Sequence, residues 1–369
     1  MDARIVAPAD LTVGEVGLWR ELQAACRDLD SPFLSPEFTQ AVAQARRDAR
    51  VAVLSSGRRT VGFLPFHAHS SGVAKPIGGP IADYQGPVLA PDVACGGAEL
   101  LAACGLSAYD FNHAPLSMSA LAGGAVHRSQ SLVMDFSAGF SAYVAGRPKA
   151  ARHAIKETER RVRRLTEDLG PVRFELHDAS EAAWPWLVEM REAGYARLGV
   201  ASGFRVPWVA RTLDALRRMQ SREFAGVLST VRAGDRLIAA QFGMRTRTTL
   251  CWWFNTYDFA LRNRAPGIVL LLMAAEHVAG RGVGRIDFGR GSEDYKLTFA
   301  TGATELCEGS IELPRTVPGR LRQLQKLGVR AFAHVPLGRF ESWPRRALSR
   351  LVTGVRLPAE PTSPGALQG

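Results

Sequence analysis

The sequence GRIDFGRGSEDYKLTFAT, residues 284–301, joins a short apolar strand to a charged loop and a short amphipathic segment. Asp287 stands between two apolar neighbours in the strand, which runs straight into glycines. Three polar side chains follow directly after the loop begins: Glu293, Tyr295 and Lys296. Loops at strand ends carry function more often than the interiors of elements do. We therefore predict a functional site where this strand ends.

The chain around this stretch, residues 147–313, alternates helices and strands in a pattern that predicts one domain. Three strands with tight turns between them predict an antiparallel meander, and a long apolar helix follows with Pro266 and Gly267 at its start. In chain order we expect a basic helix at 148–169, a strand at 172–178, helices at 181–198 and 207–221, strands at 224–232, 237–245 and 249–255, a helix at 263–280, the strand of the opening stretch with a helical turn after it, and a strand at 306–313.

Residues 1–146 predict a second unit, because 369 residues are too many for one compact core. Strands and helices alternate here as well, which is typical of an α/β or α+β unit. We expect helices at 16–27 and 35–45, a hairpin at 51–56 and 60–69, a Gly/Pro-rich loop at 75–91, a helix at 98–106, and strands at 108–114 and 132–136.

Three motifs follow one another in the second unit: LRNRAPG (261–267), IDFGRG (286–291) and YKLTF (295–299). Their order resembles the GNAT N-acyltransferases, in particular the BioF-two-type and cellulose-associated CelD-type group. YKLTF is also similar to the FK-x-x-F segment of the Fem peptidyltransferases. In the first unit SPFLSPEF, FLPF and ADYQGPVL resemble the degenerate first half of the same proteins. The resemblance implies an α/β (α+β) fold of tandem GNAT-like halves, with mixed sheets flanked by helices and catalysis in the second half.

The resemblance implies acyl-CoA, with acetyl-CoA as the usual form, as the acyl donor. Its pyrophosphate would lie at the N-terminus of the 263–280 helix, where free N–H groups and the helix dipole favour phosphate. Arg262 and Arg264 would add charge, and Gly267 would allow close approach. The loop retains one glycine of the family pattern Q/R-x-x-G-x-G/A. The family also splays the preceding strand so that a backbone N–H polarises the thioester, and Trp253 would line the site there. The alternative is an ordinary proline-started helix with surface arginines.

Lys296 matches the lysine of the Fem segment, where it is thought to stabilise the oxyanion of acyl transfer. A cation placed where negative charge develops contributes to the transition state more than to the ground state. Glu293, Asp294 or Asp287 would deprotonate the incoming amine, and Tyr295 would protonate the leaving thiolate. The alternative is that these charges form surface ion pairs, which contribute little, while Tyr295 packs against its neighbours.

An acceptor site is predicted where the two halves meet. Asp83 and Tyr84 lie in the Gly/Pro-rich loop of the first half, and such polar groups often line a cleft. Residues 147–164 hold eight basic and two acidic residues. From the sequence we expect this helix to carry positive charge on more than one face. We expect its Arg152 and Arg163 to hold the phosphate of an anionic small-molecule or carrier-linked acceptor. The alternative is a solvated linker helix.

The net charge of +11 is concentrated in that helix and in the tail, 314–369, which has ten basic and two acidic residues. The tail mixes basic and apolar residues at helical spacing, which predicts peripheral contact with an anionic membrane. No apolar run reaches the roughly 18–20 residues of a membrane-spanning helix. Five cysteines without C-x-x-C spacing indicate reduced thiols in a cytoplasmic protein, and the pair His67 and His69 lacks a third ligand, so we expect no metal.

Three functions remain open from the sequence. The first is an acyl-CoA-dependent N- or O-acyltransferase that acts by direct transfer on an amino-sugar, polysaccharide or lipid- or nucleotide-linked precursor. The second is an aminoacyl-tRNA-dependent ligase of the Fem type, the one case in which we expect nucleic acid as a partner. The third is a non-catalytic scaffold of an exopolysaccharide system.

Overall fold

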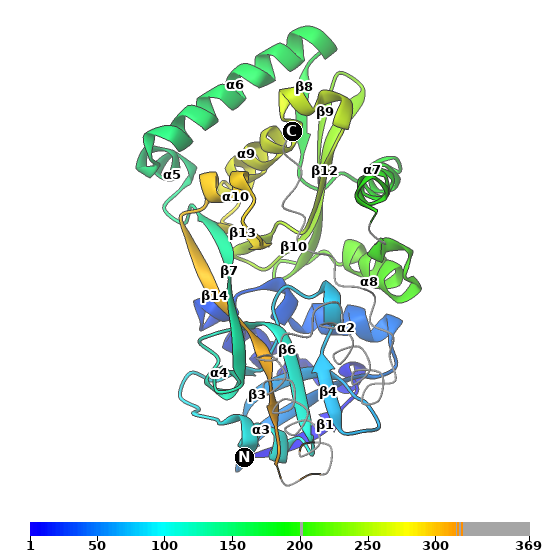
Figure 1. Cartoon of the computed structure of the whole chain (residues 1–369), viewed down its shortest axis with the longest axis vertical. Coiled ribbons are helices and arrows are strands. Elements are labelled where there is room, and N and C mark those ends of the chain that lie inside the picture. The colour runs from blue at the N-terminus through cyan, green and yellow to red at the C-terminus, as the bar shows by residue number, and fades with distance from the viewer. Residues whose placement is uncertain (200–201, 315, 317–318, 320–369) are drawn as a thin grey trace, which may run out of the picture.

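The structure, a computed structural model, describes residues 1–199, 202–314, 316 and 319. Its strands form one sheet that runs through both halves of the chain (Figure 1). The strands are β1 (Asp2–Val6), β2 (Ala49–Ser56), β3 (Arg59–His67), β4 (Val73–Pro76), β5 (Val88–Leu89), β6 (Ala108–Pro115), β7 (Ala125–Asp135), β8 (Val172–Glu175), β9 (Ala225–Ala233), β10 (Arg236–Arg245), β11 (Thr249–Cys251), β12 (Phe254–Tyr257), β13 (Arg285–Arg290) and β14 (Gly302–Glu312). The main path follows the order β1-β2-β3-β4-β6-β14-β7-β13-β11-β10-β9-β8, with β5 paired to β3 and β12 to β10.

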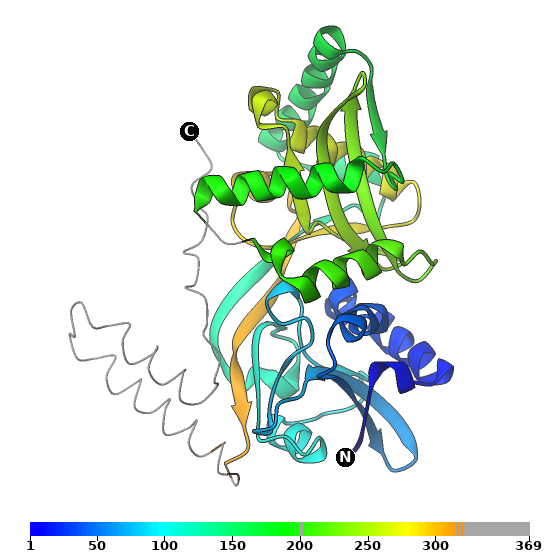
Figure 2. The same cartoon turned by 90° about the vertical axis from the view of Figure 1, so that its right-hand side faces the viewer.

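The helices cover this sheet and agree closely with those predicted from sequence. In the second half α7 and α8 cross one face (Figure 2), while α9 packs on the other face against α6 (Figure 1). The helices are α1 (Val13–Ala24), α2 (Pro36–Ala45), α3 (Gly97–Ala103), α4 (Ser119–Ala122), α5 (Phe140–Gly146), α6 (Lys149–Leu169), α7 (Ala183–Leu198), α8 (Pro207–Arg218), α9 (Pro266–Ala279) and α10 (Asp294–Phe299).

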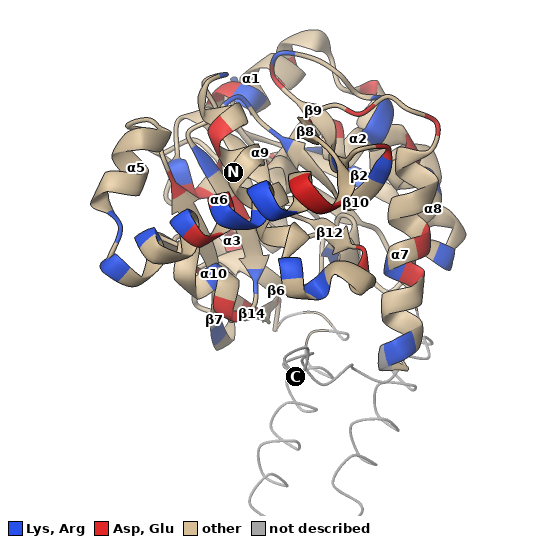
Figure 3. Ribbon diagram, turned by 90° about the horizontal axis from the view of Figure 1, so that it is seen from above, with Lys and Arg blue, Asp and Glu red and all other residues tan. Residues whose placement is uncertain are grey.

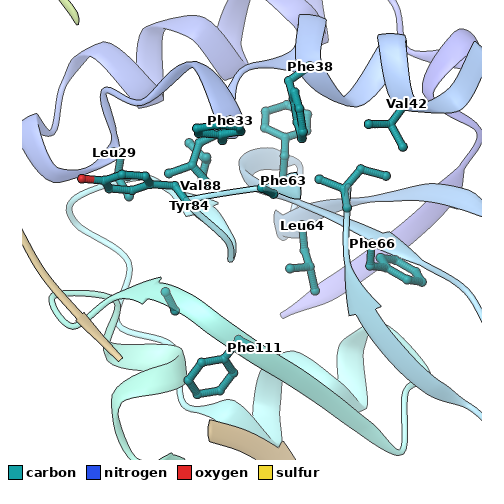
Figure 4. Close-up of a cluster of buried hydrophobic side chains, with 14 of the residues drawn as sticks. Leu29, Phe33, Phe38, Val42, Phe63, Leu64, Phe66, Tyr84, Val88 and Phe111 are labelled. Atoms are coloured by element: carbon teal, nitrogen blue, oxygen red, sulfur yellow. The ribbon is translucent and has the colours of Figure 1, made fainter. Parts of the chain in front are cut away.

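The apolar core of the first half lies between β3 and the helical segment that ends in α2, and it continues into buried side chains of the second half such as Leu213 and Phe242. Figure 4 shows Phe33 and Phe38 facing Phe63 across this core, with the Tyr84 ring at its edge. Trp19 stacks on Phe63 at 4.9 Å between ring centroids. This packing fixes the loop that carries Tyr84, so its hydroxyl group has a defined position.

Two long strands exchange between the halves. β7 belongs to the first half in sequence but pairs antiparallel with β13 of the second. β14 belongs to the second half but lies between β6 and β7. The sheet therefore crosses the sequence boundary predicted at 146, and this crossing brings residues of the first half to the end of β13.

The strand predicted at 249–255 is divided in two. β11 runs parallel to β13, with Cys251 opposite Asp287, and the Trp252 N–H donates to the Asp287 carbonyl over 2.7 Å. β12 pairs with β10 alone among the described strands. The two parallel strands thus separate directly after Trp252, and this opening is the splayed strand that the family resemblance implies.

The first strand, β1, was not expected from the sequence. It pairs with β2 as an edge strand. None of its residues is buried: Asp2, Arg4 and Ile5 are exposed, and Ala3 and Val6 are half-buried. An edge strand buries too little of either face to show the alternation by which half-buried strands are recognised.

Candidate active site

The polar residues predicted from both halves meet at the end of β13. β13 delivers Asp287, the following loop and α10 deliver Glu293 and Lys296, and the loop after β4 delivers Asp83 and Tyr84. These five residues are the polar cluster discussed below. All five were predicted as site residues, and sequence alone could not place those of one half relative to those of the other.

Asp287 is the central anion of the polar cluster. Its side chain is 5% exposed and accepts hydrogen bonds from the Tyr84 hydroxyl (2.5 Å), the Ser131 hydroxyl (2.5 Å) and the Gly289 N–H (2.8 Å). Three donors stabilise the charged form of a carboxylate. These three hydrogen bonds occupy the carboxylate oxygens, so Asp287 is less suited than Asp83 to the predicted role as proton acceptor.

Tyr84 is held as a hydrogen-bond donor. Burial, together with the charge of Asp287, raises the pKa of the Tyr84 phenol well above its usual range. The hydroxyl therefore keeps its proton near neutral pH. Its bond to Asp287 joins the first half of the chain to the second at the site itself.

Asp83 has the most unusual acid–base property in the polar cluster. Burial raises its pKa first, the negative charge of Asp287 raises it further, and Lys296 opposes both, so that the pKa reaches about 7. The side chain keeps some exposed surface, so a substrate proton can reach it. A carboxylate with a pKa near the working pH is suited to general acid–base catalysis.

Glycine is required beside Asp83. Gly289 has φ of +69°, and a Cβ atom there would lie 3.0 Å from an Asp83 carboxylate oxygen. The glycines after the strand therefore let the end of β13 approach the loop of the first half closely.

Lys296 is buried under the loop that precedes it. Its amino group donates to the Arg290 carbonyl over 3.0 Å and pairs with the Glu293 carboxylate, also over 3.0 Å. The residue is 5% exposed, whereas Glu293 is largely in solvent. The alternative of exposed surface ion pairs is thus wrong for Lys296, because the ammonium group is held in protein, close enough to Asp83 to lower that residue's pKa.

Tyr295 lies on the other side of α10 from Lys296. Its ring packs edge-on against Phe288, with 5.9 Å between centroids, and Asn255 of β12 donates to its hydroxyl over 3.4 Å. Burial and the charge of Glu293 raise the pKa of the Tyr295 phenol. The hydroxyl faces the strand that splays away from β13, where the predicted leaving thiolate would lie.

The start of α9 provides the predicted donor site. Ala265, immediately before the helix, has φ of +45°, the one positive φ of a non-glycine residue in the described chain. Arg264 forms an ion pair with Asp168 of α6, and the Arg262 guanidinium lies over the Phe259 ring at 5.0 Å. Gly267 leaves room beside Tyr257, whose ring would touch a Cβ at 3.4 Å. The two arginines and the first turn of α9 therefore fit a phosphate group, with Arg262 the less engaged cation.

Trp253 packs between the halves of the chain. Its ring meets Phe33 edge-on at 5.1 Å and stacks on Phe254 at 4.3 Å. Phe33 belongs to the first half and Phe254 to β12 of the second. The predicted contact of Trp253 with a cofactor stays a prediction.

Six of the seven Lys and Arg residues of α6 lie on one face of the helix, and the seventh, Arg161, is half-buried at the flank of that face, 3.9 Å from Glu157. α6 buries Ala151, Ile155, Thr158 and Leu165. At about 100° per residue, the six cations fall within about a third of the circumference on the opposite side. Figure 3, which looks down on the helix, shows basic residues repeated along it. This exposed basic stripe consists of Lys149, Arg152, Lys156, Arg160, Arg163 and Arg164.

The remaining predictions concern metal, membrane and tail. The described residues contain no group of three or more side chains able to hold a metal ion. Among the same residues, no helix combines the length and apolarity that crossing a bilayer requires. The tail from 320 to 369 lies outside the described residues.

Two further residues of the site have no sequence signal. Ser131 lies mid-strand in β7 and reaches Asp287 because the strands exchange. Cys251 is fully buried beside Asp83, Asp287 and Lys296, and burial raises the pKa of its thiol well above the usual range. The thiol is therefore protonated and unsuited to nucleophilic attack.

Comparisons with known proteins agree with this architecture. Residues 152–297 match the family model described as an acetyltransferase (GNAT) domain. FemX has the same fold with a TM-score of 0.57 at 10% identity, over 87% of this chain and 99% of that one. A protein of unknown function from Bacteroides thetaiotaomicron matches with a TM-score of 0.51 at 11% identity, over 81% of this chain and 98% of that one.

A third solved structure is less similar. The C-terminal domain of a putative lysylphosphatidylglycerol synthetase from Agrobacterium fabrum matches with a TM-score of 0.49 at 12% identity, over 85% of this chain and 97% of that one. No curated protein matches the chain. The expected α/β fold of GNAT type, a mixed sheet flanked by helices, is confirmed, and the matched domain also bears out the expected enzyme class, an acyltransferase.

Proposed function

From the acetyltransferase (GNAT) domain at residues 152–297, we propose that this protein moves an acyl group from acyl-CoA directly to an amine or hydroxyl group of an anionic acceptor. The acceptor group enters at the polar cluster, where the two halves meet. Acyl-CoA supplies a thioester, an acyl group activated for attack. The residues of this chain bind it, orient the acceptor and move protons.

The observation that carries the proposal is the meeting of Asp83 and Tyr84 with Asp287 and Lys296 at the mouth of the splayed strands. The four side chains come from segments some two hundred positions apart. They combine a carboxyl group of raised pKa, a fixed anion and a buried cation in one place. Such perturbed groups cluster at functional sites.

Asp83 is the proposed general base. Its pKa of about 7 lets it take a proton from an incoming ammonium or hydroxyl group near neutral pH. Glu293 is a poorer choice because its carboxylate is paired with Lys296 and lies in solvent. Asp287 is a poorer choice because three donors already hold its charge.

Lys296 is the proposed stabiliser of the negative charge that develops on the acyl oxygen. Two of its three N–H groups are used by Arg290 and Glu293, which leaves one donor and the full charge. Tyr295, whose hydroxyl lies beside Asn255 of the splayed strand, is proposed to donate a hydrogen bond to the departing sulfur, while its raised pKa makes it a weak proton donor. A donor of this kind contributes about 10²–10³-fold in rate.

The acceptor is proposed to be anionic because of the basic stripe on α6. The stripe faces solvent beside the catalytic half, where several arginines can hold a phosphate group through charge-assisted hydrogen bonds. An amino sugar on a nucleotide or lipid carrier has such a group. Membership of the BioF-two-type and CelD-type group, and a role in exopolysaccharide synthesis, stay predictions.

The experiment is a thiol-release assay with acetyl-CoA and a panel of acceptors that includes glucosamine and a nucleotide-linked amino sugar. We expect release that depends on the acceptor, rises with pH to an inflection near 7, and falls at least a hundredfold in Asp83→Asn. Acceptor-dependent release that is unchanged in Asp83→Asn would remove Asp83 from the mechanism. Absence of release with every acceptor, together with absence of acetyl-CoA binding, would refute the acyl-CoA reaction.

A Fem-type ligase is the second candidate, because FemX shares the fold over most of this chain and Lys296 stands in the matching segment. In that case aminoacyl-tRNA would replace acyl-CoA as the donor. Aminoacyl transfer from charged tRNA, in the absence of acetyl-CoA binding, would favour this candidate over the first.

A further inference from the structure

A cavity of about 510 Å³ lies on the face of the sheet that α9 covers, at the C-terminal end of that helix. It is formed by the segment after β8, the loop before β9, the turn between β10 and β11, and the residues that join α9 to β13. Its lining includes four arginines and one histidine: Arg222, Arg245, Arg247, Arg281 and His177. We call it the arginine cavity.

The arginine cavity carries positive charge that the protein does not neutralise. No acidic residue lines it. Arg247 approaches Glu223 at 3.9 Å, whereas Arg222, Arg245 and Arg281 make no ion pair with any described residue. Like charges repel one another in a partly enclosed space, so an arrangement of this kind favours an anion from solution.

One of the arginines is held in a fixed position. Arg245 donates to the Ser221 carbonyl over 2.9 Å and to the Arg222 carbonyl over 3.1 Å. Partial burial lowers its pKa, although Glu223 opposes this. A guanidinium group that is already oriented loses less entropy when it binds an anion.

The base of the cavity is apolar. Aliphatic side chains form it: Leu176, Val227, Leu250, Val278 and Val283. A volume of about 510 Å³ falls in the range of small-molecule sites. The combination suits a ligand with phosphate at one end and an apolar or aromatic body at the other.

The cavity is separate from the proposed acyl-transfer site. α9 has 14 residues, so its two ends are about 21 Å apart. The proposed donor site lies at its start and the arginine cavity at its end. Neither Asp83, Asp287 nor Lys296 lines the cavity.

We propose that the arginine cavity binds a phosphorylated small molecule of nucleotide size, with its phosphates on Arg245 and Arg281 and its apolar body on the aliphatic base. The site lies at the opposite end of α9 from the acyl donor. It is a second ligand site of this protein.

The test is calorimetric titration of the full chain with adenosine diphosphate, pyrophosphate and adenosine as probes. We expect ADP to bind more tightly than pyrophosphate, and adenosine not to bind. Arg281→Gln, at an exposed position where the arginine donates to the His277 carbonyl, should weaken ADP binding about tenfold. Arg58→Gln, exposed in the β2–β3 turn, is the matched control and should leave it unchanged.

His177 reports occupancy independently of the calorimeter. Burial lowers its pKa first, and Arg245 of β10, Arg281 after α9 and His277 of α9 lower it further. An anion bound among these charges should therefore raise the pKa, which the ring resonances report by NMR. Equal affinity for ADP and pyrophosphate would overturn the nucleotide-sized ligand in favour of free phosphate. ADP binding that is unaffected by Arg281→Gln and does not move His177 would place the nucleotide elsewhere and refute the site.

The outcome is independent of the acyl-transfer proposal. Arg281→Gln should leave acetyl-CoA titration unchanged, because the donor site lies at the other end of α9. Loss of acetyl-CoA binding in this variant would overturn the separation of the two sites.

Discussion

Replacing Asp83 with asparagine should stabilise the protein, and more so at high pH. The folded state raises the pKa of Asp83 from 3.8 to about 7, so between these values it binds more protons than the unfolded state does. Stability contributed by the protonated form is therefore lost as pH rises through this window. The full shift corresponds to roughly 4 kcal/mol, and the exposed surface that Asp83 retains reduces this to an expected gain of about 1–3 kcal/mol for the asparagine variant at pH 8.5.

The assay is urea unfolding followed by tryptophan fluorescence at pH 5.5 and pH 8.5. About half of the pKa shift of Asp83, which runs from 3.8 to about 7, lies above pH 5.5. The stabilisation by Asp83→Asn should therefore be larger at pH 8.5 than at pH 5.5 by up to about 2 kcal/mol. Asp92→Asn is the matched control, because Asp92 is exposed, pairs with Arg59 and has a lowered pKa. It should not stabilise the protein at either pH. An equal effect of Asp83→Asn at both pH values would refute the environment assigned to Asp83.

Three further predictions address the site and the joint between the halves. Lys296→Met should lower the acyl-transfer rate about 10²-fold or more, measured by thiol release, whereas Lys296→Arg keeps the charge and should retain more activity. Asp30→Ala should lower the free energy of unfolding by about 3 kcal/mol, measured in urea, because the Asp30 carboxylate accepts from the Thr246 and Thr249 hydroxyls over 2.7 Å each and pairs with Arg285. Charge reversal of the basic stripe, Arg152→Glu with Arg163→Glu, should raise the Kd of a nucleotide-linked acceptor, measured by calorimetry, since these exposed cations are proposed to hold its phosphate.

Each of these predictions has a control and a contrary outcome. Full activity of Lys296→Met would show that the buried lysine only holds the loop at 290–293. Asp10→Ala removes an exposed carboxylate of the same half, and an equal loss of stability there would contradict the special role of Asp30. An unchanged acceptor Kd after reversal of the α6 charges would leave the stripe as a solvated surface.

Much of the fold could be predicted from local sequence. Pro266 marks the start of the helix at 266–279, and the continuous apolar run after it predicts that the helix is buried. Short turn sequences between the strands predict the meander β9–β10–β11. The β11–β12 break at Trp252 could not be predicted from these signals, because it depends on β13 as a partner on one side only. Local propensity predicts that a segment is a strand, but it does not predict with which neighbouring strand the segment pairs or where that pairing ends.

The site could be predicted only in part, because its geometry is tertiary. Asp287 was identified from its place in a short apolar strand, and Lys296 from its place after that strand and its match to the Fem segment. The raised pKa of Asp83 depends on Asp287 and on burial between the halves, and both follow from the exchange of β7 and β14. Asp83 was therefore assigned to acceptor binding from sequence, whereas its environment suits a base. Trp253 was assigned to the cofactor from its position alone, and its packing on Phe33 of the other half was not foreseeable.

The central claim is that acyl-CoA binds at the start of α9. The most direct measurement is calorimetric titration with acetyl-CoA and longer acyl-CoAs, for the native protein, for Arg262→Glu and for Arg264→Glu. Arg205→Glu, an exposed position distant in sequence, serves as the control. We predict binding by the native protein and the control, a strong loss in Arg262→Glu, and a loss in Arg264→Glu, whose ion pair with Asp168 is also broken. Unchanged binding in both α9 variants, or absence of binding by the native protein, would contradict the account.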